Sequence, residues 1–184
     1  KNCLIIGGTS GLGMTIAEDL VKNEANVIVT GKTRSNVKKM TNRFNKTIEN
    51  KILVFQADLE KEDSLSKLYI ETKKFFFNID YLFFCAGINI IGRIEDVQIS
   101  QIKKIFIVNC FAVVNTFKIF LPLLKKKGGS KFILISSGSA VYGTYAQGVY
   151  SASKAAVERI IESMRFENNL NFVIINPGNM DTNF

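Results

Sequence analysis

Six short apolar runs recur along the sequence, separated by segments with the spacing of amphipathic helices. The runs are rich in Ile, Val, Leu and Phe and cover Cys3–Ile6, Val27–Val29, Ile52–Phe55, Tyr81–Cys85, Phe132–Ile135 and Phe172–Ile175. Continuous apolar runs this short are typical of strands buried on both faces, which occur in parallel sheets covered by helices. The sequence therefore predicts a parallel sheet with helices between its strands.

Apolar side chains in the intervening segments repeat with helical spacing. Leu12, Ile16 and Leu20 stand four residues apart, with Val21 widening the stripe, and predict a helix directly after the first run. A further helix is predicted from the Asp63-Ser64 pair, as its cap, to about Phe75. Strands that alternate with helices in this way predict a doubly wound α/β sheet with helices on both faces and right-handed crossovers. We expect a single domain over residues 1–184, because no linker or repeat interrupts the pattern.

The composition excludes several kinds of site. The chain has no histidine, which removes His-based triads and His-ligated metal centres. The cysteines Cys3, Cys85 and Cys110 are odd in number and far apart, so they predict neither a disulfide framework nor a metal-binding pair. We therefore expect no metal and a reducing, cytoplasmic location.

Charge and hydropathy point away from nucleic acid and membrane. The formal net charge is +8, but the densest basic run, Lys125–Lys127, precedes glycines where a helix is expected to end, and lysines favour that end of the helix dipole. The apolar stretch Ile105–Leu124 is about long enough to cross a bilayer. It contains Asn109 and Lys118, which are unfavourable in lipid, so a buried helix is the better interpretation.

A glycine-rich turn follows the first predicted strand. Its sequence is Gly7-Gly8-Thr9-Ser10-Gly11-Leu12-Gly13. A nucleotide pyrophosphate needs backbone N–H groups, a helix N-terminus and no obstructing side chains, and glycines at a strand-to-helix turn meet these needs. Glycines also occur in tight turns for steric reasons alone, without any ligand. The position of this motif directly after the first strand is what favours a dinucleotide site. We predict a dinucleotide site here.

The end of the second predicted strand bears on the choice of cofactor. An Asp or Glu at this position typically binds the ribose 2′-hydroxyl of NAD, whereas a basic residue accommodates the 2′-phosphate of NADP. This chain has no acid there but has Lys32 and Arg34, with Thr30 and Thr33 beside them. The alternative is that both are ordinary surface bases in a lysine-rich chain. We favour NADP over NAD, with Lys32 as the main phosphate partner.

Tyr150 and Lys154 stand four residues apart and would share one face of a helix. A free tyrosine has a pKa of about 10, too high for acid–base work at neutral pH. A cation about 4 Å away in a partly shielded site is worth roughly 4 kcal/mol, nearly three pKa units. The pair therefore predicts a proton donor for carbonyl reduction, although such a spacing also occurs by chance.

Together these motifs resemble those of the short-chain dehydrogenase/reductase family along essentially the whole chain. The resemblance rests on the glycine-rich turn, Asp58, Cys85-Ala86-Gly87, Asn109, Ser136-Ser137, Tyr150-Ser151-Ala152-Ser153-Lys154 and Asn176-Pro177-Gly178. It implies a Rossmann-like fold and an NAD(P)-dependent oxidoreductase acting on a small-molecule substrate. It also implies a homodimer or homotetramer formed by the helices that contain Phe111–Leu124 and Tyr150–Met164, and the apolar surface of the former fits that role.

The resemblance also implies roles for individual residues. Tyr150 would be the acid/base, Ser137 would hold the substrate oxygen, and Lys154 would lower the pKa of Tyr150 and bind the nicotinamide ribose. Asn109 would sit at a helix irregularity and support a water-linked proton relay. The residues expected to contact the cofactor are Gly7, Thr9, Ser10, Gly11, Leu12, Gly13, Lys32, Arg34, Asp58 (at the adenine), Leu59, Ala86, Gly87, Asn109, Tyr150, Lys154, and Pro177, Gly178 and Thr182 (at the nicotinamide amide).

The chain departs from the family pattern in three places. Ile6 replaces the threonine common before the first glycine, and Phe84 and Cys85 replace asparagines common before Ala86. We expect these changes to alter local bonding without loss of catalysis. The sequence ends at Phe184, where the family normally continues into a substrate lid, a further helix and a last strand.

The leading hypothesis is an NADP-dependent reductase that converts a carbonyl to an alcohol. A 3-oxoacyl thioester, a sugar and a small ketone all stay open as substrates. A non-catalytic dinucleotide-binding sensor or scaffold is the alternative, and binding without turnover would identify it. An extended-type sugar-nucleotide epimerase or dehydratase shares the Tyr–Lys spacing, but the glycine spacing argues against it.

Overall fold

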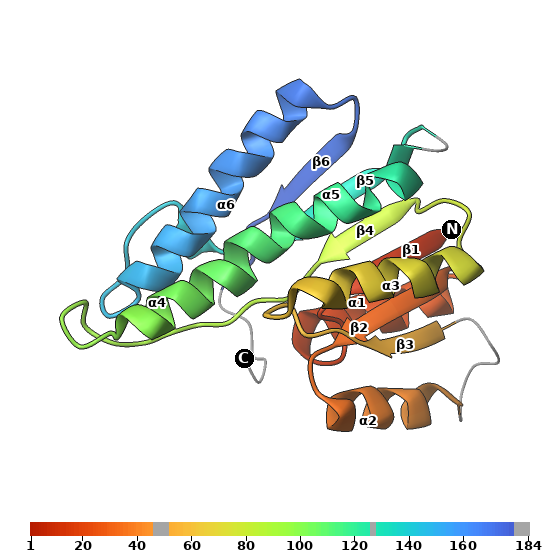
Figure 1. The fold of residues 1–184 in the computed structure, drawn as a ribbon, viewed down its shortest axis with the longest axis horizontal. Coiled ribbons are helices and arrows are strands. Elements are labelled where there is room, and N and C mark those ends of the chain that lie inside the picture. The colour runs from red at the N-terminus through yellow and green to blue at the C-terminus, as the bar shows by residue number, and fades with distance from the viewer. Residues whose placement is uncertain (46–51, 126–127, 179–184) are drawn as a thin grey trace.

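The computed structural model describes residues 1–45, 52–125 and 128–178, and within them the chain forms a six-stranded parallel sheet (Figure 1). The strands are β1 (Asn2–Ile6), β2 (Asn26–Gly31), β3 (Ile52–Gln56), β4 (Tyr81–Phe84), β5 (Lys131–Ile135) and β6 (Asn171–Ile175). Their order in the sheet is β3-β2-β1-β4-β5-β6. Each of the six predicted apolar runs forms one of these strands, so the predicted doubly wound α/β fold is confirmed.

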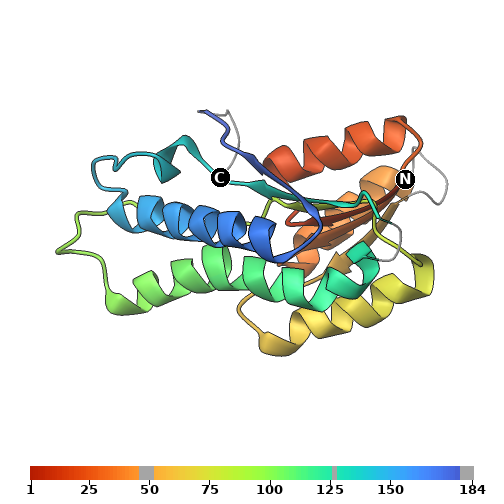
Figure 2. The same ribbon diagram turned by 90° about the horizontal axis from the view of Figure 1, so that it is seen from above.

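Helices cover both faces of the sheet (Figure 2). They are α1 (Gly11–Lys22), α2 (Arg34–Asn45), α3 (Glu62–Phe75), α4 (Ile99–Phe106), α5 (Ala112–Lys125) and α6 (Gly148–Glu167). A π-helical turn, η1 (Ile107–Phe111), joins α4 to α5, and a short 3₁₀ helix, η2 (Gly138–Ala140), precedes α6. The helices α1 and α2 pack on one face, and α3, α5 and α6 pack on the other.

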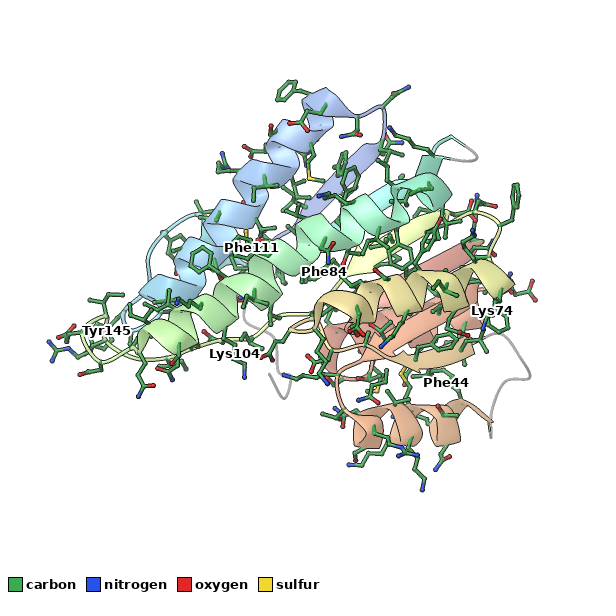
Figure 3. The ribbon with its side chains drawn as sticks, in the orientation of Figure 1. Phe44, Lys74, Phe84, Lys104, Phe111 and Tyr145 are labelled. Atoms are coloured by element: carbon green, nitrogen blue, oxygen red, sulfur yellow. The ribbon has the colours of Figure 1, made fainter. Side chains whose placement is uncertain are left out.

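Alternation of side chains along the strands builds a core on each face. On β1, Leu4 and Ile6 belong to the core under α3, α5 and α6, whereas Cys3 and Ile5 belong to the core under α1 and α2. All four are fully buried, as expected for a central parallel strand. Phe84 on β4 lies between the sheet and the helices in Figure 3 and is also fully buried.

Two local predictions differ from the structure. Of the predicted stripe of α1, Val21 is buried, but Leu12, Ile16 and Leu20 are only half-buried, and the other buried positions are two small residues, Gly13 and Ala17. The small residues face the sheet because α1 approaches it closely at the glycine-rich turn. The helix α3 begins one residue before the predicted cap, and Ser64 instead accepts a hydrogen bond from the backbone N–H of Asp58, at 2.8 Å.

Among the described residues, one helical stretch, Ile99–Lys125, is long and apolar enough to cross a membrane, and 56% of its most apolar window is buried inside the protein. This stretch contains α4, η1 and α5 and includes the segment predicted to be a buried helix. The side chains of Phe117 and Phe120 pack in the core, and Phe120 makes an edge-on contact with Tyr69 of α3, with the ring centroids 5.6 Å apart. The stretch therefore has the burial of a core helix.

Candidate active site

A cleft of about 660 Å³ lies at the carboxyl ends of the strands. The strand order reverses between β1 and β4, so the chain leaves these neighbouring strands in different directions and opens a crevice between them. The predicted site residues that line it are Gly7, Thr9, Ser10, Gly11, Leu12, Gly13, Lys32, Asp58, Leu59, Ala86, Gly87, Ser137, Tyr150, Lys154, Pro177 and Gly178. Residues far apart in the sequence thus surround one cavity.

Two of the predicted residues that the structure describes stand apart from this lining. Arg34 begins α2 and is exposed outside the cleft. Asn109 is buried behind the wall, where its neighbour Val108 reaches the cleft. Thr182 lies outside the described residues.

Hydrogen bonds hold the turn between β1 and α1 against β2, and the N-terminus of α1 that follows borders the cleft. The N–H of Gly7 donates to Thr30 Oγ1 at 3.1 Å, and that of Gly8 donates to the Thr30 carbonyl at 2.9 Å, which fixes the turn against β2. The helix α1 begins at Gly11, and the Ser10 hydroxyl makes no capping hydrogen bond to the described residues. The first N–H groups of α1 and the positive end of its dipole are therefore available to an anion.

Glycines keep the floor of the cleft clear. Gly7 has a φ of +81°, and a Cβ there would lie 2.6 Å from Cα of Ala86 on the neighbouring loop. A Cβ on Gly13 would collide with the Gly7 carbonyl oxygen. The two crossing segments can approach this closely only without side chains, which explains the glycine spacing in physical terms.

The buried amide of Asn109 joins three segments around the cleft. Its Oδ1 accepts from the N–H of Ile88 at 2.9 Å, and its Nδ2 donates to the Ile88 carbonyl at 2.9 Å and to Ser153 Oγ at 3.0 Å. Ser153 in turn donates to the Tyr150 carbonyl at 2.7 Å. Asn109 lies in the π-helical turn, and its amide connects that turn to the loop after β4 and to α6.

Tyr150 and Lys154 share the face of α6 that borders the cleft. Tyr150 is 8% exposed and Lys154 is 4% exposed. The Lys154 Nζ donates to the Ile135 carbonyl at 3.1 Å and lies 5.9 Å from the centroid of the Tyr150 ring. Burial lowers the pKa of Lys154 to about 8, and the nearby Cys85 and Glu158 partly oppose this shift. Lys154 therefore keeps its charge at neutral pH and places it beside Tyr150.

Two serines end β5 at the same edge of the cleft. Ser137 caps η2, and its Oγ accepts from the N–H of Ser139 at 3.2 Å, which leaves the hydroxyl hydrogen free to donate to a ligand. The Oγ of Ser136 is buried and has no hydrogen-bond partner among the described residues. Such an atom on the wall of a cleft fits a polar ligand.

Cys85 also lines the cleft, where the family commonly has an asparagine. Burial raises the pKa of its thiol to about 12. The thiol therefore stays protonated at neutral pH and is a poor nucleophile.

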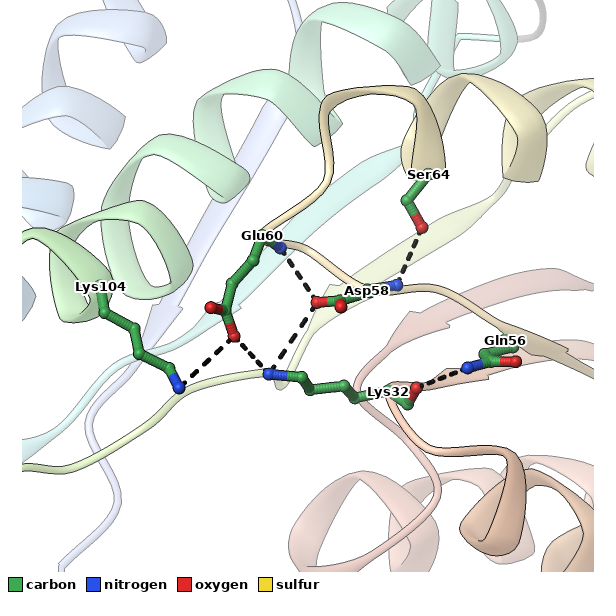
Figure 4. A network of polar contacts seen from close by, with 6 residues as sticks. All are labelled: Lys32, Gln56, Asp58, Glu60, Ser64 and Lys104. Carbon is green, nitrogen blue, oxygen red and sulfur yellow. Dashed lines mark hydrogen bonds and ion pairs between the residues drawn. The ribbon is translucent and has the colours of Figure 1, made fainter.

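At the far end of the cleft, Lys32 lies in a network of charges that the sequence patterns do not reveal (Figure 4). Its Nζ bonds to Glu60 and lies 3.9 Å from Oδ1 of Asp58. Lys104 of α4 lies 3.7 Å from the same Glu60 oxygen. The end of β2 has no acid of its own, but the end of β3 supplies two. Neither Glu60 nor Lys104 belongs to a recognisable motif, and only the register between β2 and β3 could have suggested the first.

The whole chain is similar to a known protein family: a family model described as short chain dehydrogenase matches residues 1–184. This chain belongs to the short-chain dehydrogenase family. A curated relative is the ketoacyl reductase HetN of Nostoc sp., which is 29% identical over 181 residues, or 97% of this chain and 63% of the relative. The D-beta-hydroxybutyrate dehydrogenase of Rhizobium meliloti is 26% identical over 91% of this chain and 65% of its own length. The chain thus spans less than two thirds of these relatives.

Solved structures share the fold. The alcohol dehydrogenase of Thermococcus sibiricus, complexed with 5-hydroxy-NADP, superimposes with a TM-score of 0.94 at 22% identity, covering all of this chain and 78% of that one. A family member from Burkholderia phymatum in complex with NAD gives a TM-score of 0.92 at 18% identity, covering 99% of this chain and 66% of that one. The solved structures that share this fold thus include a complex with 5-hydroxy-NADP and one with NAD.

The cleft fits the nicotinamide dinucleotide that short-chain dehydrogenases bind. The open N-terminus of α1 suits a pyrophosphate, and the glycine floor leaves room for close approach. The unpartnered Ser136 hydroxyl and the buried Lys154 give the opposite end of the cleft polar groups that a ribose and amide would satisfy. The roles of the individual predicted residues stay predictions.

The buried Lys154 makes the stability of the fold depend on pH. Its pKa is about 8 in the folded protein against an ordinary value of 10.5, so the unfolded chain binds more protons between these values. The contribution of Lys154 to stability is therefore lowest below pH 8 and rises as the pH increases toward 10.5. Relative to a Lys154→Met variant, we expect the free energy of unfolding of the wild type to gain about 2 kcal/mol between about pH 7 and pH 10, measured by urea unfolding.

A Lys118→Met variant, which replaces an exposed lysine of α5, serves as the matched control and should show a much smaller change. Taking the difference between variant and wild type cancels the other groups that titrate in this range. A difference for Lys154→Met that is the same at both pH values would contradict the lowered pKa.

Proposed function

We propose that the protein is an NADP-dependent oxidoreductase that reduces a carbonyl to an alcohol, with Tyr150 as the acid. The observation that carries the proposal is the meeting of Tyr150, Lys154 and Ser137 on one cleft that also contains the open N-terminus of α1. The bound nicotinamide would supply the hydride.

A cytoplasmic location fits the free thiols of Cys3, Cys85 and Cys110, and cell fractionation would test it.

Each polar residue at the substrate end of the cleft has its own role in the proposed proton transfer. The Ser137 hydroxyl donates a hydrogen bond to the substrate oxygen and holds it near Tyr150. The Tyr150 hydroxyl gives its proton to that oxygen as negative charge develops there. The Lys154 ammonium stabilises the tyrosinate that remains, because its positive charge lies in a site from which water is largely excluded. Asn109 keeps the first turn of α6 in position through Ser153.

The preference for NADP over NAD rests on Lys32. Its ammonium lies at the end of β2 beside the cleft, where the adenosine ribose of a dinucleotide would lie with its pyrophosphate at α1. A 2′-phosphate would gain a charged hydrogen bond there that a 2′-hydroxyl would not. Arg34, exposed at the start of α2, would add a weaker, solvent-screened attraction.

We expect the protein to bind NADPH about tenfold more tightly than NADH, which corresponds to roughly 1.4 kcal/mol for a charged hydrogen bond. Titration followed by nicotinamide fluorescence measures both affinities. Lys32→Met should remove most of this preference, whereas Lys38→Met, at an exposed lysine of α2, should retain it. Tighter binding of NADH by the wild type would overturn the NADP assignment but leave the reductase class standing.

The two loops that border the substrate end of the cleft favour an apolar substrate. They follow β4 and β5 and are joined by a hydrogen bond from the N–H of Gly92 to the Ala146 carbonyl, at 2.8 Å. Their exposed apolar side chains are Ile91, Ile94, Val141, Tyr142 and Tyr145. Tyr145 lies at the tip of the loop before α6 in Figure 3. Such a surface supports a 3-oxoacyl thioester or a small ketone in preference to a sugar.

We expect the rate of NADPH oxidation to be higher with a 3-oxoacyl thioester than with a sugar. We expect Tyr150→Phe to lower kcat at least about a hundredfold, because it removes the proton donor. The variant should bind NADPH within about twofold of the wild type, since it loses only the hydroxyl. Absorbance of the reduced nicotinamide follows turnover. Tyr69→Phe, which alters a tyrosine that packs on Phe120 away from the cleft, is the matched control. Binding without turnover of any carbonyl compound would instead identify a non-catalytic dinucleotide-binding protein.

A homodimer or homotetramer is part of the proposal. Most of the apolar side chains of Phe111–Leu124 are buried in the core, so the apolar surface does not lie along that whole helix as expected. It lies instead on α4 and η1, where a shallow apolar groove of about 400 Å³ is lined by Ile102, Lys103, Phe106, Ile107 and Phe111. Phe111 is 61% exposed, which is unfavourable for a side chain of this size in water.

We expect Phe111→Glu to convert an oligomer into monomers, because it places a charge in the apolar groove that the second copy would bury. Size-exclusion chromatography with light scattering measures the mass. Ile70→Glu changes an equally exposed apolar residue on α3 and should leave the mass of the wild type unchanged. Equal masses for Phe111→Glu and the wild type would contradict this interface.

A further inference from the structure

Four charged side chains form a chain of ion pairs at the adenosine end of the cleft (Figure 4). One Glu60 oxygen contacts both Lys32 and Lys104, and Asp58 lies 3.9 Å from Lys32. The two positive and two negative charges cancel. Lys32, the residue that would attract a 2′-phosphate, is therefore already neutralised by carboxylates in the free protein.

The backbone fixes both partners of the central pair. The N–H of Glu60 donates to Asp58 Oδ1 at 3.2 Å, and the turn that contains both is tied to α3 by the hydrogen bond from Asp58 to Ser64. On the other strand, Gln56 Nε2 donates to the Lys32 carbonyl at 3.0 Å. The carboxylate of Glu60 thus faces Lys32 because of the turn after β3. The hydrogen bond to Glu60 raises the pKa of Lys32, as expected for a stable pair.

The pairing has opposite consequences for the two cofactors. A 2′-phosphate gains the Lys32 ammonium only by displacing the Glu60 carboxylate, with which it shares the sign of its charge. A 2′-hydroxyl can donate to a carboxylate and leave the pair intact. Lys104 makes the displacement feasible, because Glu60 keeps one cationic partner when Lys32 turns to the phosphate.

We propose that Glu60 is a specificity-determining residue that competes with the 2′-phosphate for Lys32, with Lys104 holding the displaced carboxylate. The inference rests on the dinucleotide cleft of the proposed function and adds two residues from outside its motifs. It assigns Glu60 and Lys104 opposite effects: Glu60 opposes NADP binding and Lys104 assists it.

Calorimetric titration with 2′,5′-ADP, NADPH and NADH tests the proposal without turnover, since 2′,5′-ADP carries the 2′-phosphate but no nicotinamide. Glu60→Gln should raise the affinity for 2′,5′-ADP and NADPH by about three- to tenfold and leave that for NADH within about twofold. Lys104→Gln should lower the affinity for the two ligands that carry a 2′-phosphate, 2′,5′-ADP and NADPH. Asp63→Asn, which removes a carboxylate paired with Lys67 instead of Lys32, is the matched control and should change none of the three.

The outcomes separate this inference from the proposed function. If Glu60→Gln bound 2′,5′-ADP with unchanged affinity, the proposed competition between Glu60 and the 2′-phosphate would be overturned. An equal gain in affinity for NADH would also overturn it, because it would show a general effect of removing a negative charge. A wild type that prefers NADH would overturn the NADP assignment, yet a shift of the NADPH to NADH ratio in Glu60→Gln would still support the role of Glu60. Binding of no nucleotide by the wild type or by Glu60→Gln would overturn the cleft and this inference with it.

Discussion

The close approach of two backbone segments at the centre of the sheet determines the shape of the cleft. Gly7 leaves β1 against Ala86, which leaves β4, and a Cβ on Gly7 would come within 2.6 Å of it. Because the strand order reverses between β1 and β4, these segments diverge immediately above the contact. The glycines therefore leave the backbone at this contact uncovered on the side of the cleft, as the close approach of a pyrophosphate to backbone N–H groups requires.

A second constraint, the buried amide of Asn109, holds the first turn of α6, which carries Tyr150. Both N–H donors of this amide are used, one to the Ile88 carbonyl and one to Ser153 Oγ, and its oxygen accepts from the N–H of Ile88. Ser153 donates in turn to the Tyr150 carbonyl. The π-helical turn that contains Asn109 also displaces backbone groups from the regular helical pattern. The amide thus ties this turn and the loop after β4 to α6, and the water relay at Asn109 stays a prediction.

The sequence predicted the elements well because the sheet is parallel and buried on both faces, so each strand reads as one apolar run. It failed where packing uses small residues. The buried stripe of α1 consists of Gly13, Ala17 and Val21, and a search for large apolar residues finds Val21 and the half-buried flank but misses the two small residues. At the site, motif order located the glycine-rich turn and the Tyr150–Lys154 pair. The sequence indicates Ser153 only as one residue of the Tyr150–Lys154 motif, because its contact with Asn109 joins residues 44 apart in the chain.

Lys154 and Lys32 show how the same charge acts differently at the two ends of one cleft. Lys154 is buried, has a backbone carbonyl as its acceptor, and keeps a pKa of about 8, so its field reaches Tyr150 with little screening. Lys32 is half-exposed and paired with carboxylates, so its field is screened by water and cancelled by its neighbours. A net charge of +8 therefore says little about the cleft. Burial thus gives Lys154 the weakly screened charge that the proposed proton transfer uses, and pairing gives Lys32 a carboxylate partner that the proposed 2′-phosphate contact has to displace.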